Sequence, residues 1–155
     1  MANGNYNNYN NRGNPPRQQF RDTRQLPPEA KAQPLPADYV DAAEQVMRKL
    51  AGERSRITTS KIRNLHSLVS DVYNVENLRD EGELLPESVT ALTMMRIRVV
   101  YEAGREPSVK DFVREAKLLE YLKDIGNDRK RLIDFAHYME ALVAYHRFYI
   151  GGREG

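Results

Sequence analysis

Hydrophobic residues recur at steps of three and four along most of the chain after residue 37, and this spacing is typical of helices that bury one face. The pattern is longest near the C-terminus, where its inward positions are Leu132, Phe135, Ala136, Met139, Leu142, Val143, His146 and Tyr149. Asp128 offers an N-cap oxygen before this run, and Gly151 and Gly152 follow it, so both ends of a helix are marked. Charged residues interrupt the run, which therefore predicts a core helix and not a membrane span. We expect the rest of the chain to pack around it.

The same periodicity predicts four earlier helices, at residues 37–50, 58–74, 86–104 and 108–125. Glycines end the first, third and fourth of these, and Pro86 opens the third, where proline is favoured. The fourth opens with Ser108-Val-Lys-Asp111, which resembles a capping box. No segment alternates with period two over a useful length, so strands are not expected. The predicted fold class is all-α: a compact five-helix bundle with a disordered N-terminal tail.

The helix expected at residues 86–104 is apolar on nearly every side. Its apolar positions are Val89, Leu92, Met94, Met95, Ile97, Val99, Val100 and Tyr101. A helix without a broad polar face is typical of the interior, so the sequence predicts that this helix lies in the middle of the bundle.

Residues 1–36 differ from the rest of the chain in composition. They hold six of the eight prolines and begin, after Met-Ala, with a run dominated by asparagine. Such a segment cannot bury enough apolar surface to offset an ordering entropy of ~1–2 kcal/mol per residue. We therefore expect a disordered, Asn/Pro-rich basic tail at residues 1–36 and a helical bundle domain at residues 37–152. The Arg and Tyr side chains of the tail could touch RNA weakly, or the tail could be inert.

Composition excludes several classes of function. The chain has no Cys, so it can form neither a disulfide nor a zinc–thiolate site. It shows no apolar signal sequence and no transmembrane candidate, so we expect a soluble cytoplasmic protein with no membrane partner. The net charge is +2, but residues 1–37 carry five cations against two acids, and the remaining residues sum to −1. A nearly neutral domain attracts nucleic acid only through the placement of its charges.

Cations stand at two predicted helix starts, where the helix dipole normally favours Asp or Glu. Arg56 precedes the second helix, and Lys61 and Arg63 lie in or beside its first turn. The last helix opens in the same way, with Asp128-Arg-Lys-Arg131. Each such cation costs a few tenths of a kcal/mol, up to about 1, unless an anion completes the site. Two interpretations stay open at both starts: a phosphate cradle and ordinary solvated surface charge.

A second group of cations belongs to the helix at residues 86–104. Arg96 and Arg98 project about 200° apart, so they leave the helix along different edges. Arg105 follows directly after Gly104. Arg98 could pair with Glu102 one turn further on or could contact RNA, and both interpretations stay open.

The histidines give little basis for catalysis. His137 and His146 point about 180° apart on one helix, so they cannot flank the same bond. His146 lies in the apolar stripe, which favours a hydrogen-bonded core or interface histidine. The sequence has no P-loop, no H-E-x-x-H or G-x-S-x-G motif, and no paired E-x-x-H motifs of a di-metal bundle. We therefore expect no enzyme: no catalytic residue, no metal site and no cofactor.

Four blocks of the chain resemble one known family. They are Ile57–Leu65, Arg96–Arg105, Val109–Phe112 with Ala116–Leu122, and Tyr138–Tyr149. In this order they are similar to the Csm small subunit, the small α-helical subunit of type III-A CRISPR–Cas effector complexes. The likeness covers most of the predicted bundle. The Asn-rich tail and the acidic stretch at residues 76–85, which we interpret as a loop, have no counterpart in the family pattern.

The resemblance implies a non-catalytic subunit of an antiviral defence complex. Several copies would stack head to tail beside the larger subunits that hold the guide RNA. The implied partners are the Csm backbone and large subunits, other copies of itself, and the guide and target RNA. The expected RNA-binding residues are Lys61, Arg63, Arg98 and Arg105, followed by Arg56, Arg96 and Arg131, the last resting only on the helix-terminus argument.

Two other functions stay open. A helical protein–protein adaptor without direct RNA contact would keep the same bundle and use Tyr121, Tyr145 and Tyr149 as interface anchors. A small metal-independent ribonuclease would instead cleave RNA on its own and would depend on His137.

Overall fold

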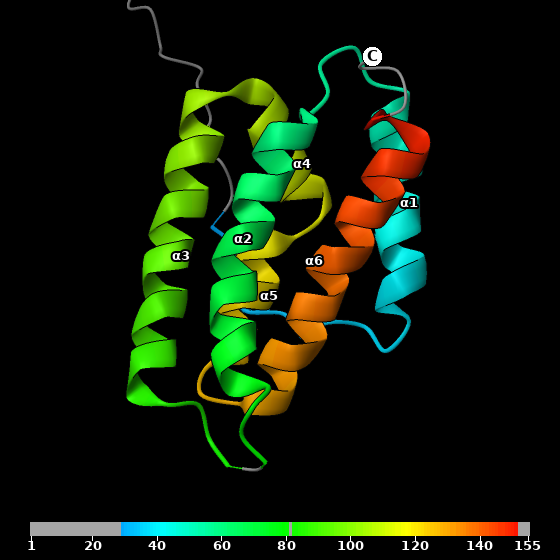
Figure 1. Ribbon diagram of the computed structural model, residues 1–155. Coiled ribbons are helices and arrows are strands. Elements are labelled where there is room, and N and C mark those ends of the chain that lie inside the picture. The colour runs from blue at the N-terminus through cyan, green and yellow to red at the C-terminus, as the bar shows by residue number, and fades with distance from the viewer. Residues whose placement is uncertain (1–28, 81, 152–155) are drawn as a thin grey trace, which may run out of the picture.

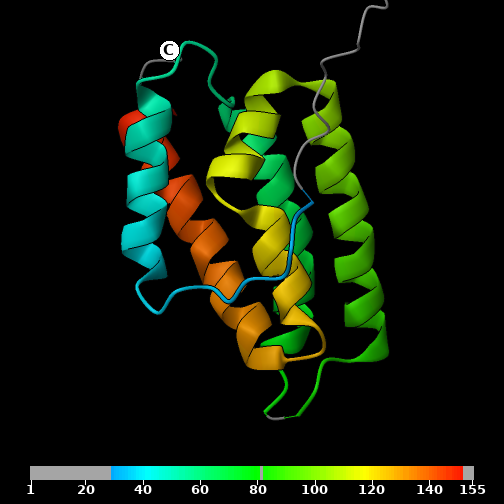
Figure 2. The same ribbon diagram turned by 180° about the vertical axis from the view of Figure 1, so that it is seen from behind.

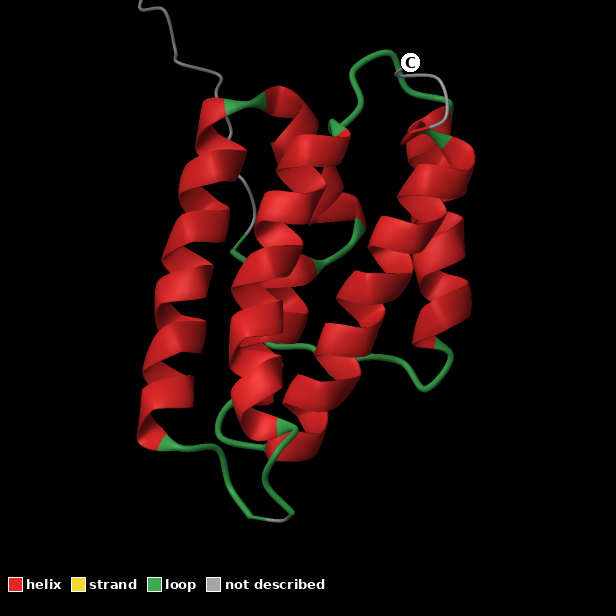
Figure 3. Ribbon diagram, in the orientation of Figure 1, coloured by secondary structure: helices red, strands yellow, loops and turns green. Residues whose placement is uncertain are grey.

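The computed structural model describes residues 29–80 and 82–151, and their helices form one bundle (Figure 1). Within these ranges six helices follow one another: α1 Tyr39–Ala51, α2 Thr59–Glu76, α3 Pro86–Arg105, α4 Pro107–Glu115, α5 Leu118–Ile125 and α6 Arg129–Tyr149. The described residues are otherwise loops, apart from one isolated bridge between Glu83 and Asp128 (Figure 3). The all-α prediction is confirmed. The predicted count of five helices is wrong, because the segment expected as one helix at residues 108–125 forms both α4 and α5.

The break between α4 and α5 lies at Lys117. Its φ is 52°, in the left-handed region that residues with a Cβ rarely adopt. The carbonyl of Ala116, the C-cap residue of α4, accepts a hydrogen bond of 2.8 Å from the buried Tyr138 hydroxyl of α6. Leu118, directly after the break, is fully buried. Apolar residues thus continue across the break without a Gly or Pro, and this is why the periodicity predicted a single helix.

The start of α4 also differs from the prediction. The helix begins at Pro107, and its N-cap residue is Glu106, whose side chain makes no capping hydrogen bond. Ser108, predicted as the cap, is buried inside the first turn. The proline therefore sets the helix start, and the Glu106 carboxylate is left to face a neighbouring helix.

The last helix lies at the centre of the packing, as predicted. In Figure 1, α6 crosses beside both α1 and α2, and it also packs against α5. Met139 and Leu142 are fully buried on it. The buried His146 donates from Nε2 to the Ile57 carbonyl at 2.7 Å. The interpretation of His146 as a hydrogen-bonded core histidine is confirmed.

α3 occupies a different place from the one predicted. It packs on α2, α4 and α5 and forms one edge of the bundle, with no described helix on its outer side (Figure 1). Four of its large apolar side chains are therefore more than half exposed: Met94, Ile97, Val100 and Tyr101. The prediction of a central helix is wrong, because no described part of the chain covers the apolar residues on the outer face of α3.

Residues 29–36 follow a defined path across the back of the bundle (Figure 2). The Gln33 N–H donates to the Glu120 carbonyl at 3.1 Å, and the Lys123 ammonium donates to the Ala30 carbonyl. Leu35 packs against the core. The predicted tail thus includes a stretch that lies along α5. Its remainder, residues 1–28, lies outside the described residues, as does Gly152 at the predicted end of the domain.

A buried carboxylate ties the lower end of the bundle together. Glu76 ends α2 and is fully buried. It accepts hydrogen bonds from the Leu85 N–H at 2.9 Å and from Arg79 at 2.7 Å. Arg129 of α6 donates to the Glu76 backbone carbonyl at 2.9 Å. The loop after α2 is therefore anchored at both ends.

Candidate functional site

A groove of about 590 Å³ runs between the first half of α2 and the last turns of α3. The two helices lie side by side and run in opposite directions, so the start of α2 meets the end of α3 (Figure 1). The groove is lined by Ser60, Lys61, Asn64, Leu65, Ser67, Leu68, Arg98, Glu102, Arg105, Glu106 and Val109. Three of the predicted RNA-binding residues, Lys61, Arg98 and Arg105, therefore share one surface although they are up to 44 positions apart in the sequence.

Two carboxylates lie among these cations. Lys61 forms an ion pair with Glu106, the N-cap residue of α4. Glu102 lies 3.2 Å from Arg98 Nε and 3.9 Å from Arg105 Nη1. The first turn of α2 has no acidic residue of its own, so Glu106 supplies the carboxylate that the helix lacks. The lining charges of the groove still sum to +1, from three cations and two acids.

The cations of the groove remain accessible to solvent. The exposed fractions of the Arg98 and Arg105 side chains are 62% and 56%, and that of Lys61 is 31%. Arg105 also lies over the Tyr101 ring, 5.7 Å from its centre. Ion pairs this exposed contribute about 0–1 kcal/mol each, so an anion in the groove can displace them at little cost.

The start of α2 is partly capped. The Thr58 hydroxyl accepts the Lys61 N–H at 3.4 Å and lies 3.3 Å from the Ser60 hydroxyl. One of the four N–H groups that a helix start leaves without an intrahelical partner is thereby satisfied. The positive end of the α2 dipole consequently opens onto the groove through Ser60 and Lys61.

The other predicted cations lie outside the groove. Arg63 is exposed and does not line the groove, because it projects from another side of α2. Arg96 is exposed and does not line the groove either, so Arg96 and Arg98 leave α3 along different edges, as predicted. Arg56 is half-buried in the loop before α2 and donates to the Ala51 carbonyl at 3.4 Å.

Arg131 lies at the far end of α6. Its guanidinium donates to the Asp124 carbonyl at 3.0 Å and lies 3.7 Å from the carboxylate of Asp128. Asp128 also caps α6 by accepting the Arg131 N–H at 3.0 Å, as the sequence predicts. The cation at this helix start is therefore already balanced by neighbouring oxygens, and the structure does not bring it near the α2–α3 groove.

A second groove, of about 250 Å³, lies on the other side of α2, against α6. We call it the α2–α6 groove, and it is lined by His66, Ser70, Tyr73, Asn74, Ala136, His137 and Glu140. The Tyr73 and His137 rings are 5.7 Å apart at 60°. Sequence reasoning compared His137 only with residues of its own helix and missed that it lines one groove with His66 of α2. The i, i+4, i+7 spacing of His66, Ser70 and Tyr73 is the signal that could have indicated a shared polar face.

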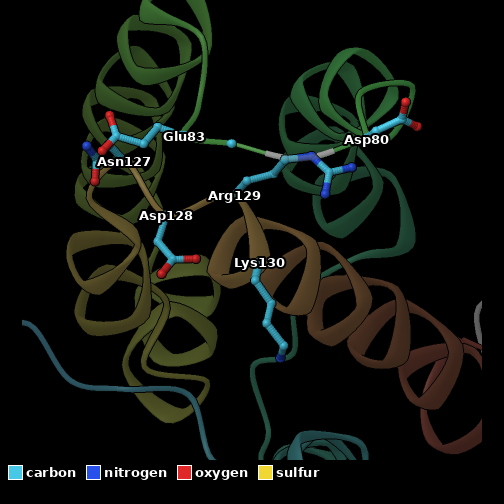
Figure 4. A pocket seen from close by; sticks show the side chains of 7 residues that line it. Asp80, Glu83, Asn127, Asp128, Arg129 and Lys130 are labelled. Carbon is cyan, nitrogen blue, oxygen red and sulfur yellow. The ribbon is translucent and has the colours of Figure 1, made fainter.

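A third hollow, of about 380 Å³, lies at the lower end between the loop after α2 and the start of α6 (Figure 4). Figure 4 shows the Asp80, Glu83 and Asp128 side chains pointing in three different directions. Arg129 turns instead towards the end of α2, where it donates to the Arg79 carbonyl at 2.6 Å. Across the described ranges no group of three or more His, Asp or Glu side chains can hold a metal ion. None of the helices in those ranges combines the length and the apolar character needed to cross a membrane.

The fold and the grooves define a small helical protein with open grooves on its surface. Its sequence matches the family model described as Csm2 Type III-A over residues 34–152. It is 42% identical over 120 residues to the CRISPR system Cms protein Csm2 of Streptococcus thermophilus, covering 76% of this chain and 94% of that protein. It is 41% identical over 114 residues to the protein of the same name from Mycobacterium tuberculosis (strain CDC 1551 / Oshkosh), covering 72% and 90%. The chain belongs to the Csm2 family, the small subunits of type III-A CRISPR–Cas effector complexes. The predicted resemblance is confirmed.

Proposed function

We propose that this chain is a non-catalytic small subunit that stacks in copies within the effector complex and contacts the phosphate backbone of target or guide RNA through the α2–α3 groove. The observation that carries the proposal is the convergence of Lys61, Arg98 and Arg105 on one open surface. Backbone contacts of this kind hold a nucleic acid in place without reading its sequence. Pairing between guide and target would then supply the choice of sequence.

The ion pairs of the groove are compatible with this role. A phosphate that enters the groove exchanges weak, solvated carboxylate contacts for charge-assisted hydrogen bonds to two guanidinium groups and one ammonium. Glu102 and Glu106 would be released to solvent on the groove rim. While no RNA is bound, the same two acids keep the groove surface near neutrality. This reduces repulsion between stacked copies.

The remaining cations are assigned to the path of the RNA beyond the groove. Arg56 and Arg63 lie near the start of α2 and are proposed to contact the same strand as it leaves the groove. Arg96 and Arg131 lie away from the groove, so they would meet a different stretch of RNA.

The proposal is tested by measuring the affinity of the full chain for single-stranded RNA across a salt series. Replacing both arginines, Arg98→Ala with Arg105→Ala, should weaken binding at low salt. Removing two phosphate contacts should also reduce the slope of log K against log salt by ~1.4 for a single strand. Lys61→Ala should act in the same direction. The matched control is Arg114→Ala, because Arg114 is an equally exposed arginine of α4 that pairs with Asp111 at 2.9 Å, away from the groove.

Salt-independent binding by the wild-type chain would contradict phosphate recognition. A loss of affinity in the Arg114→Ala control as large as that in the single variant Lys61→Ala would show that only net charge matters and would reject the groove. Cleavage of labelled RNA by the purified wild-type chain, abolished by His137→Ala, would replace the proposal with a ribonuclease.

One observation favours protein contact as well as RNA contact. The apolar outer face of α3, formed by Met94, Ile97, Val100 and Tyr101, leaves about half of each side chain in water. Exposed apolar surface of this kind marks interaction sites. An adaptor without RNA contact would use this face and leave the groove cations without a ligand.

We assign this α3 face to a second copy of the chain. A groove of about 710 Å³ runs along it, between α3 and α2, and is lined by two charged residues, Asp71 and Arg98. Arg98 is paired with Glu102 at 3.2 Å, whereas Asp71 is exposed. Elsewhere on the chain, the α6 side chain Phe148 is 77% exposed and follows the exposed Arg147. Neither Asp71 nor Arg147 forms an ion pair among the described residues. An aromatic side chain beside a cation is complementary to an apolar groove beside a carboxylate, and a contact between two different surfaces of one chain builds an open stack.

A further inference from the structure

We propose that the α2–α6 groove holds one unpaired nucleobase of the RNA whose backbone crosses the α2–α3 groove. This inference rests on the proposed function and adds a second contact of a different chemical kind. Both grooves are built on α2, one on each side, so a single strand that crosses α2 can reach both.

The lining of the α2–α6 groove is suited to a base and not to a phosphate. It contains no Lys or Arg, and Glu140 places a carboxylate at its edge. A carboxylate repels phosphate but accepts hydrogen bonds from the N–H groups of a base edge. The charge of this lining is therefore opposite in sign to that of the α2–α3 groove.

The rings of the α2–α6 groove supply a stacking surface. Tyr73 and His137 lie 5.7 Å apart at 60°, and both are half-buried, so their rings are held in place while part of each stays accessible. Unpaired bases stack on such side chains in single-strand recognition. The volume of about 250 Å³ lies below the ~300–1,000 Å³ of ordinary ligand pockets, which suits one ring system.

Polar groups of this groove remain available for a ligand. Asn74 and Glu140 are exposed, and among the described residues no hydrogen bond or ion pair engages either side chain. The Ser70 hydroxyl, by contrast, is already bonded to the His66 carbonyl at 3.1 Å. Asn74 and Glu140 are thus the groups that can meet the edge of a stacked base.

The position of Arg63 fits the same arrangement. It lies three residues before His66 on α2 and is exposed, and no described residue forms an ion pair with it. Residues three apart are neighbours on a helix surface, so Arg63 stands beside the α2–α6 groove without lining it. It is placed to meet the phosphate that carries the bound base.

The test compares two single strands of equal length: oligouridylate, and an abasic ribose-phosphate strand with the same number of phosphates. Fluorescence anisotropy with the full chain should show roughly fivefold or tighter binding of the base-bearing strand. His137→Ala and Asn74→Ala should each bring this ratio towards one. His137→Phe should keep the ratio, because it retains a stacking ring. Tyr145→Ala, which removes an aromatic ring of α6 outside the groove, is the matched control and should leave the ratio unchanged.

Two results would overturn the inference: equal affinity of the wild-type chain for the two strands, or a ratio that stays unchanged in both His137→Ala and Asn74→Ala. Thermal unfolding of each variant shows whether a lost ratio reflects a lost fold. The abasic strand also separates this inference from the proposed function. If its salt-dependent binding disappears in the Arg98 and Arg105 double variant, the phosphate groove stands whatever the base-dependent ratio shows.

Discussion

At the scale of single residues, Glu76 shows that tertiary contacts decide whether a charged side chain is exposed or buried. In the sequence it belongs to an acidic stretch that reads as a solvated loop, but in the fold it is fully buried at the end of α2. Burial alone would raise the pKa of its carboxyl. Hydrogen bonds from Ser88, the Leu85 N–H and Arg79 outweigh that effect and hold the pKa below its ordinary value of 4.5.

The lowered pKa of Glu76 predicts a specific dependence of stability on pH. Because the folded pKa lies below the unfolded one, this contribution is fully present above about pH 4.5 and is lost as the pH falls through the folded pKa. Glu76→Gln should therefore be less stable than wild type at pH 7, by ~1–3 kcal/mol. The difference should shrink towards pH 3. Urea unfolding of both proteins at several pH values measures it, and a difference that stays constant with pH would contradict the prediction.

Removing the whole side chain should have a larger effect. Glu76→Ala leaves the Leu85 N–H without its acceptor and removes the carboxylate partner of Arg79, which keeps its hydrogen bond to the Glu83 carbonyl. The unsatisfied N–H costs ~1–3 kcal/mol, and the cavity left by the buried side chain adds to that loss. Glu83→Ala is a suitable control, because the exposed Glu83 carboxylate belongs to the same loop and forms no ion pair among the described residues. If both variants lose equal stability, the effect belongs to the loop and not to the buried carboxylate.

At the scale of elements, the break between α4 and α5 depends on a hydrogen bond from another helix. The Tyr138 hydroxyl is buried and donates to the carbonyl of Ala116. Burial also raises the pKa of Tyr138 well above its ordinary value, so the hydroxyl keeps its proton at any ordinary pH. Lys117 then turns the chain in the left-handed conformation, and α5 begins with its apolar face towards α6.

We expect Tyr138→Phe to lower the free energy of unfolding by ~1–3 kcal/mol, because it leaves the buried Ala116 carbonyl without a donor. Chemical denaturation measures this loss. Tyr101→Phe, at an exposed position of α3, should change stability by less than about 0.5 kcal/mol. Equal values for the two variants would show that the interhelical hydrogen bond does not stabilise the break.

A cavity in the central helix should cost more than this hydrogen bond. Leu142 is fully buried on α6, and Leu142→Ala should lower the free energy of unfolding by ~2–5 kcal/mol. The same substitution at Leu78, which is 86% exposed, serves as the control. A small effect at Leu142 would mean that α6 is not the centre of the packing.

At the scale of the whole molecule, the position of α3 leaves an apolar face without a partner among the described residues. A helix that is apolar on all sides suits the interior of a bundle or a site covered by another molecule. Here α3 forms the edge of the described bundle, so its outer face lacks the cover that other described helices could give. The proposed contact between copies provides that cover and would make the molecule a repeating unit.

This contact predicts that association depends on the outer face of α3. Ile97→Glu introduces a charge at the centre of that face, where Ile97 is 57% exposed, and should reduce self-association in sedimentation velocity runs at increasing concentration. Phe148→Ala should also reduce self-association, because Phe148 of one copy is proposed to fill the α3 face of the next. Val40→Glu makes the same kind of change at a similarly exposed position of α1, where Val40 is 46% exposed, and should have no effect. Unchanged association in Ile97→Glu would reject this surface, and a monomeric wild-type chain at all concentrations would reject stacking by the isolated protein.

The helices and their inward faces could be read from the sequence, because local periodicity and capping residues determine them. Asp128 caps α6, Pro86 begins α3, and the apolar stripe of α6 lies in the core. The family was recognisable for the same reason, since its blocks are continuous in sequence. The break at Lys117 was not readable, because the hydrogen bond that accompanies it comes from a residue 22 positions away from Ala116.

The candidate site depended more on tertiary structure than the helices did. The sequence alone determined which cations stand at a helix start and which two edges of α3 carry Arg96 and Arg98. Only the packing of α2 against α3 decided that Lys61, Arg98 and Arg105 share a groove, that Glu106 balances Lys61, and that Arg131 lies elsewhere. The physical reason is that a side chain's direction follows from the local helix period, whereas its partners are set by contacts between segments far apart in the chain.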